Sequence, residues 1–120
     1  MRYTAALAIA CAAVSIETDA AELGECHETS IRKVSSYFPE EPLGKSGVML
    51  EFADGLVLIN RADNNAALTS RVGDAVTVCL EYIPEDCPAG DDRGRFYRVI
   101  NKDSGGANTL TNSPHSCGGA

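Results

Sequence analysis

Residues 70–101 read SRVGDAVTVCLEYIPEDCPAGDDRGRFYRVIN, and they contain two strand signals separated by a polar loop. At every second position of residues 76–82 an apolar side chain recurs, so an extended chain places these side chains on one side, which we expect to face the core. They are Val76, Val78, Leu80 and Tyr82. Gly73-Asp74, just before them, is typical of a turn, because glycine accepts positive φ and the aspartate side chain can accept hydrogen bonds from nearby backbone amides. The pattern predicts a strand that begins near Ala75.

A loop and a returning strand follow this first strand. Pro84 has no amide hydrogen to donate to a neighbouring strand, and residues 85–94 are rich in turn formers. The first strand is therefore expected to end near Ile83, and residues 95–101 are predicted to return beside it.

Other parts of the chain also carry strand signals. Residues 30–38 mix apolar and polar side chains without a clean period, so we expect a strand with a bulge or bend there. Residues 48–52 and 56–60 flank Asp54-Gly55, which predicts a hairpin closed by a type I′ turn, since that turn needs positive φ at both central positions. Residues 108–111 are predicted to form a last short strand.

Helix signals are weak. Residues 62–68 are short and rich in Asn, so we expect no more than one or two helical turns from them. Five or six short strands separated by turns predict an all-β fold, either a small antiparallel barrel or a sandwich of the OB or SH3-like kind. The sequence leaves the choice between these topologies open.

The first 20 residues are typical of a secretory signal peptide. Arg2 supplies a positive charge near the start, and the apolar run of residues 5–16 is too short to span a bilayer as a helix. Small residues precede two possible cleavage sites, after Ala20 and after Ser15, and we prefer the first. Residues 21–120 would then form one domain, periplasmic or secreted.

Cys11 offers an alternative reading of the leader. Small residues precede it, as they would at a lipid attachment site, but no leucine stands three residues before it. We therefore prefer the cleaved signal peptide and keep lipidation as the alternative. No other stretch of the sequence is long and apolar enough for a transmembrane helix.

Four cysteines follow Ala20, and an even number in a short exported chain predicts two disulfides. They are Cys26, Cys79, Cys87 and Cys117. We expect the pairs Cys26–Cys117 and Cys79–Cys87, because pairing of the first and last strands of a closing barrel would bring the first pair together. The pairing Cys26–Cys87 with Cys79–Cys117 is the alternative. Cys79 alternates with core positions, so its partner should lie on the outer face of the sheet.

Net charge restricts the expected partners. The full chain carries −7, and loss of Arg2, Glu17 and Asp19 with the leader would leave about −6. An acidic surface repels phosphate backbones and anionic lipids, so we expect no nucleic acid partner and consider a cationic protein or peptide the natural one. The alternative is that the charge serves solubility alone.

Two motifs connect the chain to known proteins. One is C-L-x-x-I-P-x-x-C-P-x-G-D-x-R-G-R-x-Y at residues 79–97, and the other is H-S-C-G-G-A at residues 115–120. Over about residues 46–120 the chain resembles a group of small exported proteins of rhizobia and related alphaproteobacteria. The resemblance implies export and paired cysteines, and it implies no activity and no functional residue.

Histidines next to cysteines are the candidate metal ligands. Cys26-His27 and His115-x-Cys117 would supply two sulfurs and two imidazoles, a set suited to zinc or copper, if the two ends of the domain met. The alternative is that His27 and His115 are exposed and flank disulfides, because an oxidising compartment converts neighbouring thiols to a bridge. We prefer this alternative and expect no cofactor.

The polar loop contains the candidate binding residues, Asp91, Asp92, Arg93 and Arg95. Guanidinium groups beside carboxylates are suited to gripping a carboxylate or sulfate. The alternative is a solvated loop whose Asp and Arg side chains pair with one another.

Catalytic motifs are missing from the sequence. It contains neither G-x-S-x-G nor H-E-x-x-H, and its two histidines lie near the ends of the predicted domain. We therefore expect a non-enzymatic binding module. The alternative is an inhibitor or immunity-type partner of a cationic hydrolase such as a lysozyme. Ser46-Gly47 resembles the Ser-Gly pair of periplasmic lysozyme inhibitors, although Val48 stands here where they have a tyrosine.

Overall fold

The computed structural model describes residues 22–62 and 65–119. The predicted signal peptide, residues 1–20, and the alternative lipid site Cys11 lie outside the described residues. The described part contains six strands and one short 3₁₀ helix, joined by turns and loops. Their bounds are β1 Cys26–Ser35, β2 Val48–Phe52, β3 Val57–Asn60, η1 Ala66–Thr69, β4 Ala75–Tyr82, β5 Phe96–Asn101 and β6 Ala107–Thr111.

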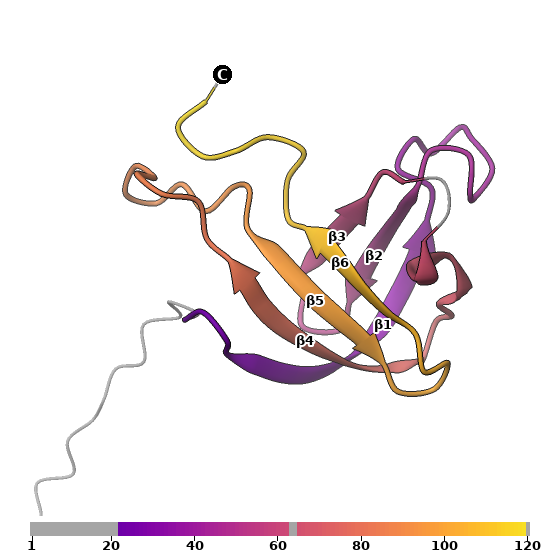
Figure 1. Cartoon of the computed structure of the whole chain (residues 1–120). Coiled ribbons are helices and arrows are strands. Elements are labelled where there is room, and N and C mark those ends of the chain that lie inside the picture. The colour runs from indigo at the N-terminus through magenta and orange to yellow at the C-terminus, as the bar shows by residue number, and fades with distance from the viewer. Residues whose placement is uncertain (1–21, 63–64, 120) are drawn as a thin grey trace, which may run out of the picture.

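The strands form one closed antiparallel barrel in the order β1-β2-β3-β6-β5-β4 (Figure 1). β1 to β3 form one three-stranded meander and β4 to β6 form another, and the seams β1–β4 and β3–β6 join them. The predicted all-β antiparallel fold is thus confirmed, and of its two predicted forms, barrel and sandwich, the chain adopts the barrel. Closure leaves no continuous free sheet edge, which is the usual way that small β domains avoid edge-to-edge association.

β1 pairs with strands of both meanders. Its residues 26–30 pair with β4, and its residues 31–35 pair with β2. The register shifts between Ile31 and Lys33, which confirms the predicted irregularity in this strand. The strand begins earlier than the sequence pattern suggested, because its first residues are held by β4 and not by an apolar period of their own.

Alternating side chains fill the barrel. The buried core is Ile31, Val48, Leu50, Phe52, Leu58, Ala67, Val76, Val78, Leu80, Tyr97, Val99 and Leu110. Val76, Val78 and Leu80 face inward as predicted, but the prediction for Tyr82 is wrong. Its side chain is 50% exposed, because the β4–β5 register shifts between Leu80 and Tyr82. Such an irregularity breaks the alternation, so Tyr82 no longer faces the same side as Leu80.

The hairpin between β2 and β3 is confirmed, but its turn differs from the predicted one. Gly55 has φ +94°, whereas Asp54 does not have a positive φ, so the turn is not type I′. The Gly55 amide donates to the Phe52 carbonyl at 2.9 Å, and the Phe52 amide donates to the Leu56 carbonyl at 2.9 Å. This is the pattern of a three-residue loop whose last residue is a left-handed glycine.

Because neighbouring strands run in opposite directions, the connections gather at two ends of the barrel (Figure 1). We call one of them the η1 end, which comprises residues 36–47, residues 66–70 and the turn 102–106. The other is the tail end, which comprises residues 22–27, 53–56, 81–96 and 112–119, that is, the connections together with the last residues of β4 and the first of β5. Of the helical structure expected within residues 62–68, the described part contains η1 alone. Within that part, no helix is long and apolar enough to cross a membrane.

Candidate functional site at the tail end of the barrel

The disulfides join Cys26 to Cys79 and Cys87 to Cys117, with Cα atoms 4.0 Å and 5.3 Å apart. Both predicted pairs, Cys26–Cys117 and Cys79–Cys87, are therefore wrong, and so is the alternative connectivity. The prediction assumed that the first and last strands are neighbours. In the barrel, β1 lies between β2 and β4, and β6 lies between β3 and β5.

One part of the cysteine argument holds. Cys79 points away from the core, and its partner lies on the outer face, as expected from the alternation in β4. That partner is Cys26, which is directly opposite Cys79 in the β1–β4 register. Opposed side chains of an antiparallel pair lie on the same face, so the two sulfurs meet outside the barrel wall.

The second disulfide ties the β4–β5 loop, residues 83–95, to the segment after β6. An ion pair reinforces this tie: the Asp91 carboxylate accepts hydrogen bonds from Arg93 Nε at 2.9 Å and Nη2 at 2.8 Å. The same carboxylate accepts the Gly118 amide at 3.0 Å, and Arg93 Nη2 also donates to the Gly119 carbonyl at 3.3 Å. The pair therefore holds the tail as well as itself.

Asn112 fastens the other side of the loop. Its Oδ1 accepts the amides of Gly94 and Arg95, each at 3.0 Å, and its Nδ2 donates to the Asp92 carbonyl at 2.7 Å. Gly94 has φ +86°, and a Cβ there would stand 2.8 Å from the Cα of Ser116. Only glycine allows so close an approach of the two segments. Loop and tail consequently form one fixed unit.

Electrostatics favour the charged form of the Asp91–Arg93 pair. The Arg93 guanidinium, followed by the Gly118 amide, holds the pKa of Asp91 well below its usual range. Asp91 in turn raises the pKa of Arg93. Of the four predicted binding residues, the structure thus brings these two together as partners of each other.

The side chains of the other two predicted binding residues, Asp92 and Arg95, form no ion pair or hydrogen bond with this pair. The Asp92 side chain is exposed. Arg95 lies near Tyr97: burial raises the pKa of the Tyr97 hydroxyl, and the Arg95 guanidinium partly offsets that rise. Their role in binding stays a prediction.

The two histidines are separate. His27 Nε2 lies 2.8 Å from Asp54 Oδ2, which links the start of β1 to the β2–β3 turn. His115 belongs to the tail, where its amide donates to Ser113 Oγ at 3.1 Å. The two sulfurs that the metal hypothesis needed, those of Cys26 and Cys117, belong to different disulfides. In residues 22–62 and 65–119, no group of three or more His, Cys, Asp or Glu side chains is placed to hold a metal ion.

Two aromatic side chains stand at the base of the β4–β5 loop, and sequence reasoning missed their role. Tyr82 precedes the loop, Phe96 follows it, and their ring centroids are 5.8 Å apart. Their side chains are 50% and 40% exposed. An unbroken alternation along β4 would have buried Tyr82, so the only available signal was the proline two residues later, at which the strand had to end.

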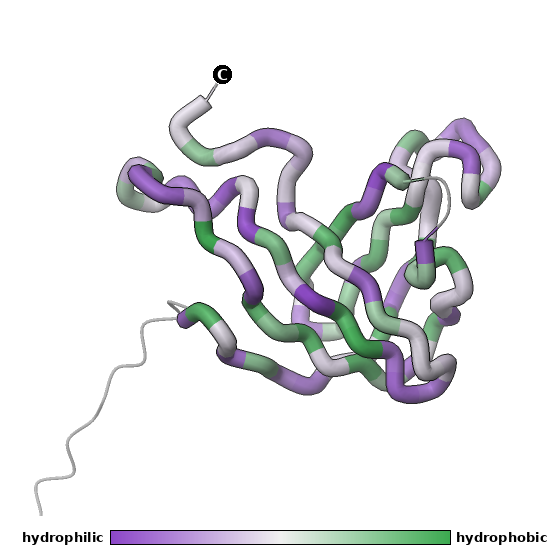
Figure 2. Tube along the Cα trace, viewed as in Figure 1, coloured by the Kyte–Doolittle hydropathy of each residue, from purple (hydrophilic) through white to green (hydrophobic). Residues whose placement is uncertain are grey.

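Negative charge collects at the same end of the barrel (Figure 2 shows hydrophilic residues along the loop). The tail end has eight carboxylates against two arginines, a formal charge of −6. The acids are Glu22, Glu25, Asp54, Glu81, Glu85, Asp86, Asp91 and Asp92, and the bases are Arg93 and Arg95. In the rest of the described chain, seven bases and six acids give +1. These bases are Arg32, Lys33, Lys45, Arg61, Arg71, Arg98 and Lys102, and the acids are Glu28, Glu40, Glu41, Glu51, Asp74 and Asp103.

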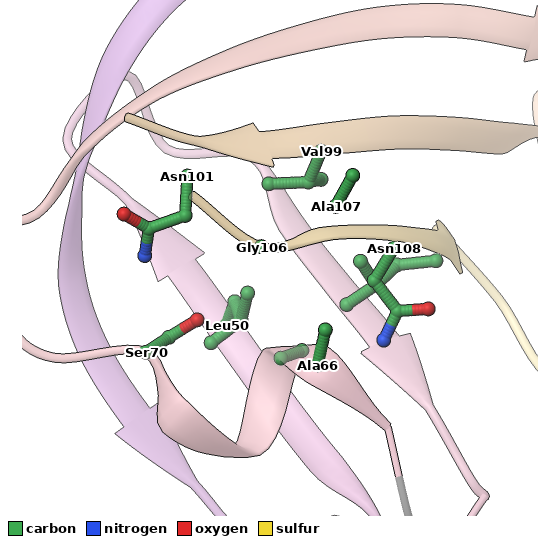
Figure 3. Close-up of a pocket in the computed structure, with 10 residues that line it drawn as sticks. Leu50, Ala66, Ser70, Val99, Asn101, Gly106, Ala107 and Asn108 are labelled. Carbon is green, nitrogen blue, oxygen red and sulfur yellow. The ribbon is translucent and has the colours of Figure 1, made fainter. Parts of the chain in front are cut away.

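A hollow lies at the η1 end, between η1 and β6 (Figure 3). It is small, about 10 Å³, roughly the room that one water molecule needs. The two asparagine side chains on its rim have partners, since Asn101 donates to Asp74 and Asn108 donates to Asn65, each at 2.8 Å. This hollow is a junction of the fold and not a ligand pocket.

Comparison with family models, with curated proteins and with solved structures finds no match for this chain. The tail end is therefore interpreted from its own geometry. It combines a locked loop, an exposed aromatic pair and most of the net negative charge.

Proposed function

We propose that this chain is an exported binding module without catalytic activity, and that it binds its partner at the tail end. The observation that carries the proposal is the locking of the β4–β5 loop. The loop is tied to the tail by the Cys87–Cys117 bridge, by the Asp91–Arg93 pair and by Asn112.

Locking matters because a mobile loop loses conformational freedom when it binds a partner. Ordering costs about 1–2 kcal/mol for each backbone residue fixed, so a loop fixed in advance retains more of its contact energy as affinity. Small domains that recognise other proteins commonly present binding loops on a rigid β scaffold. The closed barrel supplies such a scaffold here.

Export is the other part of the proposal. Two disulfides suit an oxidising compartment, and residues 1–20 have the pattern of a cleavable leader. We place the mature chain in the periplasm or outside the cell. Intact-mass measurement of the native product should give a first residue of Ala21, or Ile16 if the second cleavage site is used. Recovery of the full-length chain from the cytoplasm would contradict export.

A second candidate function is inhibition of, or immunity to, a cationic hydrolase such as a lysozyme. The gathering of carboxylates at the tail end favours it, because charge of one sign on one face attracts a partner of the opposite sign. Ser46-Gly47 does not contribute to this argument. It lies in the β1–β2 loop at the η1 end, where Ser46 Oγ is 2.5 Å from Ser36 Oγ and accepts the Phe38 amide at 3.2 Å.

Two double variants test the binding module. Cys87→Ser/Cys117→Ser removes the bridge that locks the loop, and Cys26→Ser/Cys79→Ser removes the other bridge as a matched control. Each protein is immobilised and exposed to the exported protein fraction of the native host, and retained proteins are identified by mass spectrometry. Circular dichroism first verifies that both variants are folded.

We expect the wild type and the control to retain the same exported protein. The loop variant should retain at least about tenfold less, which corresponds to about 1.4 kcal/mol of lost binding free energy. Failure of the wild-type chain to retain any exported protein would contradict the binding module. Equal retention by all three proteins would show that binding does not depend on the bridge that locks the β4–β5 loop.

A further inference from the structure

We infer that the tail end carries a docking surface for a basic protein, in which Tyr82 and Phe96 form the apolar centre and surrounding carboxylates form the rim. This inference rests on the proposed binding function and adds the surface and the chemistry of the partner. We call this surface the acidic face. Its residues are Glu22, Leu23, Glu25, Glu81, Tyr82, Glu85, Asp86 and Phe96.

The apolar centre comes from three segments of the chain. Tyr82 ends β4 and Phe96 begins β5, and their rings contact each other while remaining half-exposed. Leu23, 61% exposed, lies beside the end of β4, because the amide of the next residue, Gly24, donates to the Leu80 carbonyl at 2.8 Å. Exposed apolar side chains that gather in one place and are rimmed by polar residues are typical of protein interaction sites.

The rim carboxylates differ from two carboxylates of the barrel wall in having no cationic partner among the described residues. Glu28 and Glu51, on the barrel wall, form ion pairs with Lys102 and Arg32. In contrast, no rim carboxylate forms an ion pair with any cation of residues 22–62 and 65–119. Glu22, Glu25, Glu81, Glu85 and Asp86 are all exposed.

The loop that carries part of this rim is held in place. Glu85 and Asp86 directly precede Cys87, whose bridge to Cys117 fixes the backbone. Asp86 has φ +60°, a left-handed conformation that aspartate tolerates better than most residues. Both carboxylates therefore start from fixed backbone positions, in the segment that directly follows Tyr82 along the chain.

Charge complementarity determines the kind of partner. The tail end carries −6 while the rest of the described chain carries +1. The electrostatic field of the molecule therefore attracts a cationic surface to the tail end. The carboxylates are spread over the start of β1, the end of β4 and the β4–β5 loop, a distribution that fits several Lys and Arg side chains at once. An arginine of the partner could also stack on Tyr82 or Phe96. A basic protein with an exposed apolar side chain matches all of these features.

Charge placement is tested with a pair of matched variants. Glu85→Gln/Asp86→Asn removes two charges from the acidic face, and Asn keeps the tolerance of Asp for the left-handed conformation. Glu40→Gln/Glu41→Gln removes the same charge from the η1 end. Phe96→Ala removes an aromatic side chain from the acidic face, and Phe38→Ala does so at the η1 end, where Phe38 is 47% exposed.

The experiment repeats the capture from the exported fraction of the host with these four variants and the wild type. The retained protein is then purified, and its affinity for each variant is measured by calorimetry at about 0.05 M and about 0.5 M salt, which brackets strong and weak screening. We expect a retained protein with an isoelectric point above about 9, a value typical of strongly cationic surfaces. Its affinity should fall about tenfold with Glu85→Gln/Asp86→Asn, with Phe96→Ala and with high salt. The two η1-end variants should bind within about twofold of the wild type.

Different results would overturn different statements. A retained protein that is acidic, or one whose affinity falls equally with Glu40→Gln/Glu41→Gln, overturns the inference but leaves the binding module intact. Unchanged binding by Phe96→Ala and by Glu85→Gln/Asp86→Asn does the same, and it places the contact elsewhere on the barrel. Absence of any retained protein contradicts the proposed function itself.

Discussion

Cys26 and Cys79 are directly opposed residues of β1 and β4, and their Cα atoms are 4.0 Å apart. The backbone on either side of them is paired, since the Leu80 amide donates to the Glu25 carbonyl at 2.9 Å. The disulfide therefore links β1 to β4 at the end of their hydrogen-bonded pairing, where β1 begins. Backbone hydrogen bonds from the Gly24 and Leu80 amides also hold the start of β1 and the end of β4 together.

Peptide mapping without reduction checks both disulfides. Trypsin alone is insufficient, because no Lys or Arg lies between Cys79 and Cys87 and both would remain on one peptide. Additional cleavage after Glu81 or Glu85 separates them. We expect one fragment that joins Cys26 to Cys79 and another that joins Cys87 to Cys117. A fragment that joins Cys26 to Cys117 would contradict the fold of the tail.

Removal of either disulfide should lower stability by a similar amount. The bridges close loops with sequence separations of 53 and 30 residues, for which the chain-entropy model gives about 4 kcal/mol each. Urea denaturation of Cys26→Ser/Cys79→Ser and of Cys87→Ser/Cys117→Ser measures the two losses. Amide exchange should show that only the second variant loses protection at Gly118. Loss of that protection in the first variant would mean that the tail is held mainly by β1 and β4.

Acid should loosen the tail only at low pH. The pKa of Asp91 is lowered in the folded protein by Arg93 and by the Gly118 amide. Because the folded pKa lies below the unfolded value of about 3.9, the stabilisation is complete above that pH and is lost as pH falls through the lower folded value. An NMR titration of the Asp91 carboxyl carbon should therefore give a midpoint well below pH 4. In Asp91→Asn the acid-dependent change in Gly118 exchange should disappear, and a midpoint near 4 would refute the lowered pKa.

Gly47 and Gly55 should respond very differently to substitution by alanine. Both have positive φ, +82° and +94°, but a Cβ at Gly47 would lie 2.1 Å from the Asn60 carbonyl oxygen, whereas Gly55 has open space around it. We expect Gly55→Ala to cost about 1–2 kcal/mol, the penalty of the left-handed conformation alone. Gly47→Ala adds a backbone clash and should cost more than about 3 kcal/mol or prevent folding. Equal losses for the two variants in thermal unfolding would argue against the close approach of the β1–β2 loop to β3.

Much of the barrel could be predicted from local sequence. The alternation of Val76, Val78 and Leu80 located the inner face of β4, and Asp54-Gly55 located the β2–β3 hairpin. Neither depends on the rest of the chain, because alternation is set by the period of a strand and a tight turn by its own few residues. The turn type was wrong, since a left-handed Gly55 fits more than one turn.

The candidate site was less accessible to such reasoning. Arg93 and Asp91 were found from their residue types, but their pairing depends on the tail, which approaches the loop from 26 residues away at Gly119. Tyr82 was assigned to the core because nothing in the sequence marks the register shift at the end of β4. The grouping of Tyr82 with Phe96 and with the acids at the start of β1 therefore became visible only in the folded chain.

The sequence by itself determined the strands, most of the turns, the inner face of β4 and the outward direction of Cys79. The tertiary structure decided which strands are neighbours, and with them the disulfide pairs and the gathering of negative charge at one end. The physical reason is that strand identity follows from interactions between residues close in sequence. Strand order is instead set by closure of the whole barrel around one core, to which every strand contributes and which no single segment encodes.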